Sequence, residues 1–366
     1  MRMVHYKNKR IVLEKREVRS GKILFIVPII SFIVSLVLGA VVLAASGANP
    51  FSTYFYMARG AFGSWVGFTE TLVKAIPLIL TGLGVTIAFK LRFWNIGAEG
   101  QLVFGAIGTA WVMIFWTFLP VQMLLPIALL VGMTAGALWA GIAAVLKAKW
   151  GVDETLTTLM MNYIAILFAE YLYYGPWRDP DGYGFPGTKA FPREAWLPRI
   201  AGRAHWGLVI ALAAAVILWF VLYKTKWGFE IKMIGLNQRA ARCQGVNIQR
   251  NIILVLLVSG ALSGLAGAVE VTAVQHRLMK GIDMGYGFTA IIVAWMAQLN
   301  PFAAVLVALI MAGLLVGGDQ IQMMMGLPAS MGLVLQGLLL FPLLAGTIFS
   351  DYRLRVVKQE EVEQCS

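Results

Sequence analysis

Charged residues are scarce in this chain, and their scarcity excludes an ordinary soluble domain. Asp, Glu, Lys and Arg make up 13% of the 366 residues, against about 25% in soluble proteins. Hydrophobic residues make up 59%, and the mean hydropathy is +0.77. Because long apolar runs recur from one end to the other, the sequence predicts an all-α polytopic membrane protein.

Cysteine and histidine are also rare, which excludes several kinds of site. The two cysteines, Cys243 and Cys365, are far apart and have no neighbouring histidine, so neither a disulfide framework nor a zinc site is expected. The sequence contains no phosphate-binding Walker motif, no H-E-x-x-H and no recognisable triad. We therefore predict no catalytic residues, no metal site and no enzyme. An enzyme or flippase acting on lipid-linked substrates would need a site built from polar groups near the membrane.

The net charge of +12 is explained by membrane topology rather than by nucleic-acid binding. Most Lys and Arg residues lie between apolar runs and at the termini, as the positive-inside rule expects. Residues 1–22 form a basic tail and residues 350–366 a second tail, and both termini are predicted to be cytoplasmic. No nucleic-acid partner is expected.

Residues 23–349 are predicted to form a transmembrane domain of about ten helices. A long loop over residues 175–205, rich in Gly, Pro, Trp and Tyr, is predicted to lie outside. One segment, residues 288–299, is too short to cross the membrane as a straight helix. The predicted spans are residues 23–45, 72–89, 102–119, 124–146, 156–174, 206–223, 252–273, 288–299, 302–316 and 329–349.

Residues 235–250, GLNQRAARCQGVNIQR, form the longest polar segment between two spans on the predicted cytoplasmic side. Asn237 can cap a helix of about two turns over residues 238–244, and Gly245 can supply the left-handed residue that ends it. So short a helix is marginal alone and needs a surface to pack against. The segment is either an ordinary basic loop or a docking element on which a soluble partner acts.

A second polar stretch, WNIGAEGQ over residues 94–101, stands at the start of a span. A charge inside a membrane is costly, at least about 2.5 kcal/mol at its centre, so Glu99 is a candidate for contact with substrate or a gate, with Asn95 and Gln101 beside it. The structural alternative is that Glu99 accepts hydrogen bonds from backbone at the start of its own helix. Asn162 is a further pathway candidate, with a helix–helix hydrogen bond as its alternative.

Other polar and small residues have simpler expected roles. Glu270 is expected to reach the membrane interface from the outer end of its span, and Asp319 to be solvated in an outer loop. The repeat SGALSGLAGA, residues 259–268, is expected to let helix backbones approach closely. Residues 97–101 and 285–288 resemble each other weakly, which in many carriers points to the transport pathway.

Three motifs together resemble a known family. NIGAEGQ at residues 95–101, GVDETLTTLMMNYIA at 151–165 and GLNQRAARCQGVN with the following span at 235–270 are similar to the permease subunits of ATP-binding-cassette importers. Within these, they look most like the nucleoside and simple-sugar branch that works with basic membrane lipoproteins. The resemblance runs over about residues 72–346 and leaves out the basic N-terminal extension.

The resemblance implies a type II importer-like permease in a bacterial cytoplasmic membrane. The implied partners are a cytoplasmic ATP-binding subunit, a second permease that is identical or different, and an extracytoplasmic substrate-binding lipoprotein, with residues 175–205 expected to meet the lipoprotein. ATP and Mg would be bound by the partner and no cofactor by this chain. Residues 235–245 would be the coupling helix that enters a cleft on the ATPase. The predicted coupling residues are Gly235, Asn237, Arg239, Ala240, Ala241, Arg242 and Gly245.

The expected function is nucleoside uptake by alternating access driven by the partner ATPase. Asn95, Glu99, Gln101 and Asn162 are the predicted pathway or gate residues. A permease for ribose-like sugars is the first alternative. A secondary carrier driven by protons or sodium is the second, with Glu99 or Glu270 as the relay.

Overall fold

The computed structural model describes residues 5–6, 9–15, 21–116, 118–182, 184–328 and 330–358. The chain divides into two compact units, which we describe separately. Residues 1–54 and 333–366 form the first unit, and Phe55–Gly332 forms the second. Cys365 lies outside the described residues.

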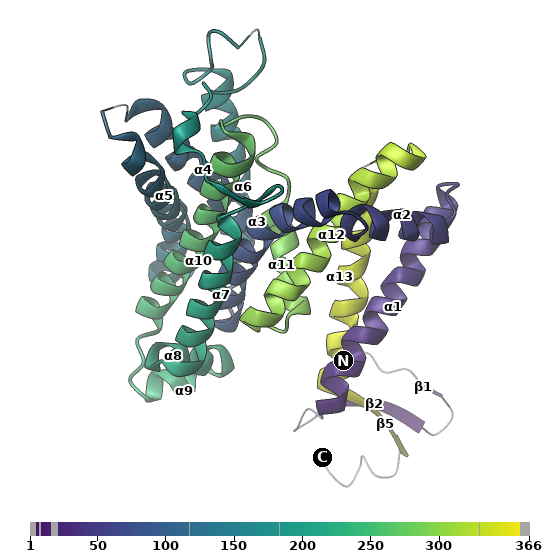
Figure 1. Ribbon diagram of the computed structural model, residues 1–366. Helices are drawn as coiled ribbons and strands as arrows, with labels where there is room; N and C mark the ends of the chain where they lie inside the picture. The colour runs from purple at the N-terminus through teal and green to yellow at the C-terminus, as the bar shows by residue number, and fades with distance from the viewer. Residues whose placement is uncertain are drawn as a thin grey trace. The chain divides into compact units, whose positions relative to one another are not determined.

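The first unit combines the two ends of the chain. Its helices are α1 (Gly21–Ala45) and most of α13 (Ser330–Asp351). The two helices pack closely at Gly39 of α1, because a Cβ added there would lie 2.7 Å from a methyl carbon of Leu335 in α13. The strands are β1 (His5–Tyr6), β2 (Lys9–Lys15) and β5 (Tyr352–Lys358). They form an antiparallel sheet in the order β1-β2-β5, visible in Figure 1.

The sheet lies within the two predicted tails, residues 1–22 and 350–366. The β2 and β5 segments, KRIVLEK and YRLRVVK, are rich in β-branched and aromatic residues, which favour strands. Their pairing runs from Lys9 opposite Lys358 to Lys15 opposite Tyr352. Segments near the two ends of the chain therefore lie side by side in this unit.

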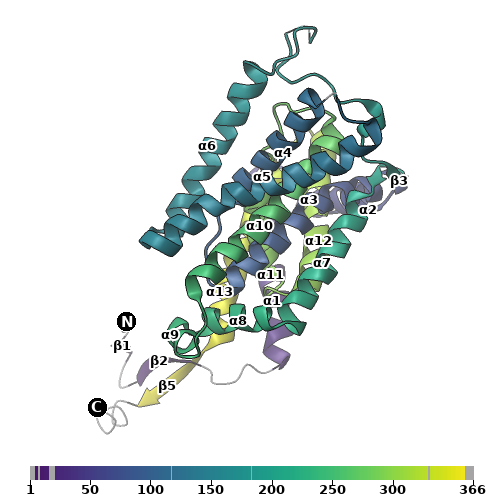
Figure 2. The same cartoon turned by 90° about the vertical axis from the view of Figure 1, so that its left-hand side faces the viewer.

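The second unit is a helical bundle, seen from two sides in Figures 1 and 2. Its central helix is α3, which is buried along most of its length and packs against α7, α10, α11 and α12. The helices are α2 (Pro50–Phe62, whose first turn belongs to the other unit), α3 (Trp65–Lys90), α4 (Ala98–Phe115), α5 (Val121–Trp150), α6 (Glu154–Tyr174), α7 (Gly207–Lys224), α8 (Lys226–Leu236), α9 (Gln238–Cys243), α10 (Ile248–Glu270), α11 (Tyr286–Met296) and α12 (Pro301–Met325).

Small residues allow α4, α5 and α10 to pack closely, as the repeat at residues 259–268 predicts. A Cβ added at Gly264 of α10 would lie 2.5 Å from the carbonyl oxygen of Gly132 in α5, and one at Gly105 of α4 would lie 2.1 Å from the carbonyl oxygen of Gly264. These helices meet backbone to backbone (Figure 2). The packing prediction is confirmed.

Among the described residues, seven helices are long and apolar enough to cross a membrane: α3, α4, α5, α6, α7, α10 continued by the π-turn η2 (Val271–Gln275), and α12. An eighth is obtained if the broken pair α1–α2 is one span. The chain is thus a mostly helical, multi-pass membrane protein. The count of about ten spans stays a prediction, because α11 has only 11 residues.

The boundary of α12 corrects one expectation. The helix continues to Met325, past the predicted end at residue 316, because the Gly317–Gly318 pair packs inside the bundle instead of ending the helix. Asp319 consequently lies in a helix, not in an outer loop, and forms an ion pair with Lys74 of α3.

Candidate coupling, pathway and outer sites

The predicted short helix is present as α9, between α8 and α10. The Asn237 side chain accepts hydrogen bonds from the backbone N–H groups of Arg239 (2.9 Å) and Ala240 (3.2 Å), which caps the helix. Gly245 follows at φ +78°, and the Val246 N–H returns to the Ala241 carbonyl at 3.1 Å. The local prediction of cap and stop residues is confirmed, with the helix ending at Cys243.

α9 presents most of its side chains to the outside of the unit. Ala241 is fully buried, whereas Arg239, Ala240 and Arg242 are exposed, and Leu236 just before the helix is 78% exposed. A shallow pocket of about 440 Å³ lies against Gln238, Arg239, Arg242 and Cys243. A two-turn helix with exposed arginines and an exposed leucine is chemically suited to a protein partner.

Unlike the other predicted coupling residues, Gly235 lies in the last turn of α8, and like Ala241 it is buried. A Cβ there would lie 2.0 Å from the Lys90 carbonyl oxygen at the end of α3. Asn251 of α10 also holds α8: it accepts a hydrogen bond from Trp227 Nε1 (2.8 Å) and donates to Glu230 (2.9 Å). α9 is therefore attached to a helix that contacts both α3 and α10.

The polar stretch before α4 is held by buried amide side chains. Asn95 donates to Gln101 (3.2 Å) and to Ser259 of α10 (2.9 Å), and accepts from the Gln101 amide (3.0 Å). Asn162 of α6 accepts from the Gly100 N–H and donates to the Ile96 carbonyl, both at 2.8 Å. The structure thus brings Asn95, Gln101 and Asn162 together, each no more than 2% exposed.

Glu99 binds a different helix from the one expected. Its carboxylate accepts hydrogen bonds from the backbone N–H groups of Gly285 (2.8 Å) and Gly287 (2.5 Å), where α11 begins. Glu99 thus accepts backbone hydrogen bonds at a helix N-terminus, as the structural alternative expected, but the helix is α11 and not its own. A helix N-terminus attracts a negative group because its first N–H groups have no partner within the helix. The half-length helix α11 supplies such a terminus inside the bundle, and Glu99 is 1% exposed there.

The weak repeat noted in the sequence corresponds to a direct contact. A Cβ at Gly287 would lie 2.1 Å from the Glu99 nitrogen, so residues 97–101 and 285–288 pack against each other. Ala98 also shares a buried cluster with Val85 and Phe89 of α3 and Ala290 and Ala294 of α11. The two broken segments therefore join α4 to α11 beside the central helix.

The long loop at residues 175–205 is ordered against the segment that follows α10. Thr188 accepts a hydrogen bond from the Leu278 N–H at 3.0 Å, the Phe191 N–H donates to the His276 carbonyl at 2.8 Å, and the rings of Trp196 and His276 stack at 3.5 Å. The loop carries the 3₁₀ turn η1 (Arg193–Ala195) and the strands β3 (Arg199–Ala201) and β4 (Ala204–His205). It lies at the end of this unit opposite α8 and α9 (Figure 1).

His205 anchors the end of this loop and is 2% exposed. Its Nδ1 accepts a hydrogen bond from the Gly207 N–H at 3.2 Å, where α7 begins. Burial, together with the neighbouring His276 and Arg199, lowers the pKa of His205 to about 4. The imidazole is therefore neutral at physiological pH.

Sequence reasoning missed a group of charged residues at this same end of the unit. Glu70 and Lys74 occupy one face of α3, and each pairs with another element: Glu70 with Arg203 at 3.0 Å, and Lys74 with Asp319 of α12. Glu270 of α10 is 5% exposed, so the expectation that it reaches the interface is wrong. The i, i+4 spacing of Glu70 and Lys74 could have indicated that both lie on one face of a helix. The predicted span began at residue 72 and therefore left Glu70 out of that helix.

Comparisons with known proteins agree with these features. Residues 67–344 match the family described as "Branched-chain amino acid transport system / permease component". The chain is 35% identical over 361 residues to the glucose ABC transporter permease protein TsgB13 of Haloferax volcanii, which covers 95% of this chain and 94% of that protein. It is 35% identical over 337 residues to the guanosine ABC transporter permease protein NupP of Bacillus subtilis, with 91% and 95% covered.

A further relative is the nucleoside ABC transporter permease protein NupB of Lactococcus lactis, 32% identical over 302 residues, with 80% of this chain and 83% of that protein covered. The family match extends over most of the bundle, including both broken segments and the capped helix α9. The chain therefore belongs to the family of permease components of branched-chain amino acid-type transport systems, and it is the non-catalytic, multi-pass membrane subunit of an ABC importer.

Proposed function

We propose that this permease carries nucleosides. The observation that supports this most strongly is the 35% identity, along 91% of this chain, to a permease named for guanosine, together with a second relative named for nucleosides. A permease named for glucose is equally similar, which supports a simple sugar as the alternative cargo. Both classes of compound present a ring with several hydroxyl groups.

We propose that α9 is the coupling helix and docks in a cleft of the partner ATPase. Exposed Arg239, Ala240 and Arg242 would form the contact, and Asn237 and Gly245 would fix the two ends of the helix. Ala241 is buried and attaches the helix to the bundle. Movement of the ATPase would reach α3 through the close contact between Gly235 and Lys90.

Alternating access would then involve the joint between α4 and α11. Asn95, Glu99, Gln101 and Asn162 hold this joint through hydrogen bonds to backbone and to one another. In this proposal they act as gate residues, because rearranging their hydrogen bonds changes the packing of the two buried helix starts, those of α4 and α11, beside α3. Substrate choice would rest largely with the delivering lipoprotein.

The proposed topology has about ten spans, with both termini in the cytoplasm. It adds the α1–α2 pair, the half-length α11 and α13 to the seven full-length candidates. The pairing of β2 with β5 supports termini on one side of the membrane. The basic residues of the N-terminal segment favour the cytoplasmic side of a bacterial inner membrane.

The proposed assembly contains this chain, a second permease that is identical or different, and two ATP-binding subunits. A substrate-binding lipoprotein would dock on residues 175–205, where Phe185 is 76% exposed and the backbone is anchored to residues 276–278. An anchored loop transmits a docking force better than a free one, which supports this assignment.

The experiment that tests the cargo is uptake of labelled nucleosides into cells that express this chain with its neighbouring transporter genes. Unlabelled nucleosides should compete, and ribose and other sugars should not. Competition by sugars but not by nucleosides would indicate that the cargo is a simple sugar. Uptake that persists without the ATPase and stops with a proton uncoupler would contradict the importer and favour the ion-driven carrier.

A further inference from the structure

We propose that two adjoining pockets at the outer end of α3 form a nucleoside-binding site on the permease itself. One pocket is polar and would hold the ribose, and the other is aromatic and would hold the base. The inference rests on the proposed function, because it specifies where the permease meets the cargo that the lipoprotein delivers.

The polar pocket has a volume of about 560 Å³, within the range of about 300–1,000 Å³ common for small-molecule sites. It lies between the end of α2, the first turns of α3, the last turns of α12 and the turn between β3 and β4. The polar side chains that line it are those of Tyr56, Arg59, Glu70, Arg203, Asp319 and Gln320.

Ion pairs neutralise most of the charge at this pocket and favour a neutral ligand. Arg59, Arg203, Glu70 and Asp319 line the pocket, where Glu70 pairs with Arg203 and Asp319 pairs with Lys74. Carboxylates accept hydrogen bonds from hydroxyl groups, and guanidinium and amide groups donate them. Glu70, Asp319 and Arg203 are 24%, 51% and 58% exposed at their side chains, so they can exchange water for sugar hydroxyls.

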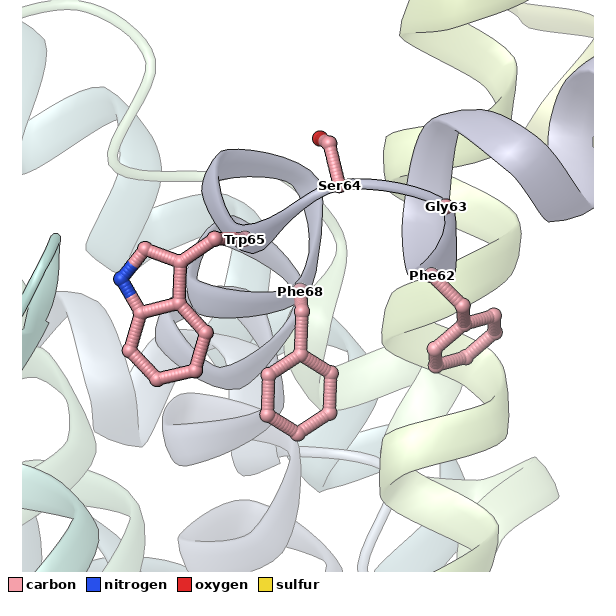
Figure 3. A pocket seen from close by; sticks show the side chains of 5 residues that line it. All are labelled: Phe62, Gly63, Ser64, Trp65 and Phe68. Carbon is pink, nitrogen blue, oxygen red and sulfur yellow. The ribbon is translucent and has the colours of Figure 1, made fainter.

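The aromatic pocket adjoins the polar one, since Gly63 and Ser64 line both. Its volume is about 310 Å³. Figure 3 shows the side chains of Phe62, Trp65 and Phe68 on one side of the short connection between α2 and α3, and that of Ser64 on the other side. Trp65 and Phe62 are 63% and 50% exposed. An exposed ring offers a stacking surface to a nucleobase.

Because the polar and the aromatic pocket adjoin, the two together fit some ligands better than others. A simple sugar would use only the polar pocket and a free base only the aromatic one, whereas a nucleoside can use both. The pockets also lie at the end of α3 opposite Lys90 and α8 (Figure 1), where a cargo released by an outer lipoprotein would arrive.

The test is substrate protection of an introduced thiol. Met323 lines the polar pocket and is 74% exposed, so Met323→Cys is made in a chain with Cys243→Ser and Cys365→Ser. Right-side-out vesicles carry the complete membrane complex without the lipoprotein, and labelling by a membrane-impermeant maleimide is timed. A nucleoside at twice its Kd should slow labelling about threefold, because the free fraction is 1/(1 + [L]/Kd).

Matched variants separate the two pockets. Phe185→Cys, in the outer loop, should label at the same rate with or without nucleoside. With Trp65→Leu added, protection by nucleoside should fall to the level given by ribose. With Glu70→Gln added, protection by both should be lost. Gln320→Ala leaves both ion pairs in place and should also weaken protection, which keeps the test decisive if Glu70→Gln fails to insert.

Uptake by the full transporter, measured in parallel, distinguishes the two hypotheses. Normal nucleoside uptake with unprotected labelling of Met323→Cys would overturn the site and leave the proposed function standing. Absent nucleoside uptake by the wild type would overturn the proposed function. Equal protection in Trp65→Leu and the wild type would overturn the assignment of the aromatic pocket to the base.

Discussion

Glu99 shows what can be learned about a single residue from sequence and what cannot. Its place in a Gly-broken stretch between apolar runs marks it as a residue with a specific partner, since a charge in a membrane is costly. The partner lies 186 residues further on, at Gly285, and local sequence contains no signal for that distance. Gly285 adopts φ +80°, and Gly287 packs against the Glu99 backbone. The need for glycine at these two positions can be explained only from the three-dimensional structure.

We expect Glu99→Gln to destabilise the joint between α4 and α11 by about 1–3 kcal/mol. The amide retains one acceptor oxygen, but its NH₂ group faces an N–H donor, so one of the two backbone groups loses its partner. The thermal midpoint of the purified protein in detergent should fall. Glu170→Gln in α6 is the control and should leave the midpoint unchanged. An unchanged midpoint in Glu99→Gln would contradict the structural part of the account.

His205 should make stability fall as the pH falls from about 6.5 to about 4. The folded-state pKa is depressed to about 4, so in this window the unfolded chain binds a proton that the folded chain does not. Stability is complete above the unfolded pKa and declines toward the folded one. His205→Asn retains an acceptor for the Gly207 N–H. Its thermal midpoint should depend less on pH than that of the wild type, and an identical dependence would refute the assignment.

At the scale of elements, the best predictions rested on local chemistry. The cap and stop residues of α9 are determined within a few positions, so Asn237 and Gly245 could be identified directly. The end of α12 and the strands β2 and β5 could not, because each depends on packing against distant residues. A helix–helix hydrogen bond was the structural alternative for Asn162, but its partners, Gly100 and Ile96 at the start of α4, could not be identified from the sequence.

Removing the cap of α9 should loosen that helix. Asn237→Ala loses the acceptor for two N–H groups, a change worth about 1 kcal/mol. Amide hydrogen exchange in residues 238–243 should quicken about fivefold when measured by mass spectrometry, since 1.4 kcal/mol corresponds to tenfold. Asn237→Asp keeps an acceptor and should exchange as the wild type does. Equal exchange in all three proteins would show that the cap does not support α9.

At the scale of the whole molecule, composition and charge distribution were sufficient to predict a multi-pass helical protein, and three motifs were sufficient for the family. The number of spans was harder, because the half-length α11 and the broken α1–α2 pair do not follow the usual length rule. The strands near the two ends of the chain add a contact that hydropathy does not reveal.

Cross-linking can test that contact. Ile11 lies opposite Val356 in the antiparallel pair of β2 and β5, so Ile11→Cys with Val356→Cys, in a chain without Cys243 and Cys365, should form a disulfide under mild oxidation. Ile11→Cys with Arg353→Cys is out of register and should cross-link poorly. Failure of the first pair, or equal yields from both, would contradict the sheet and with it the support for termini on one side.

The central claim is that ATP hydrolysis by a partner drives this permease through α9. The most direct measurement is nucleoside accumulation and ATP hydrolysis by the complete transporter in liposomes, for the wild type and for Arg239→Glu combined with Ala240→Glu. Both residues are exposed, so the variant should insert normally. The account predicts ATP-dependent accumulation in the wild type and hydrolysis without accumulation, or loss of the ATPase, in the variant. Full accumulation by the variant with the ATPase still bound would contradict it.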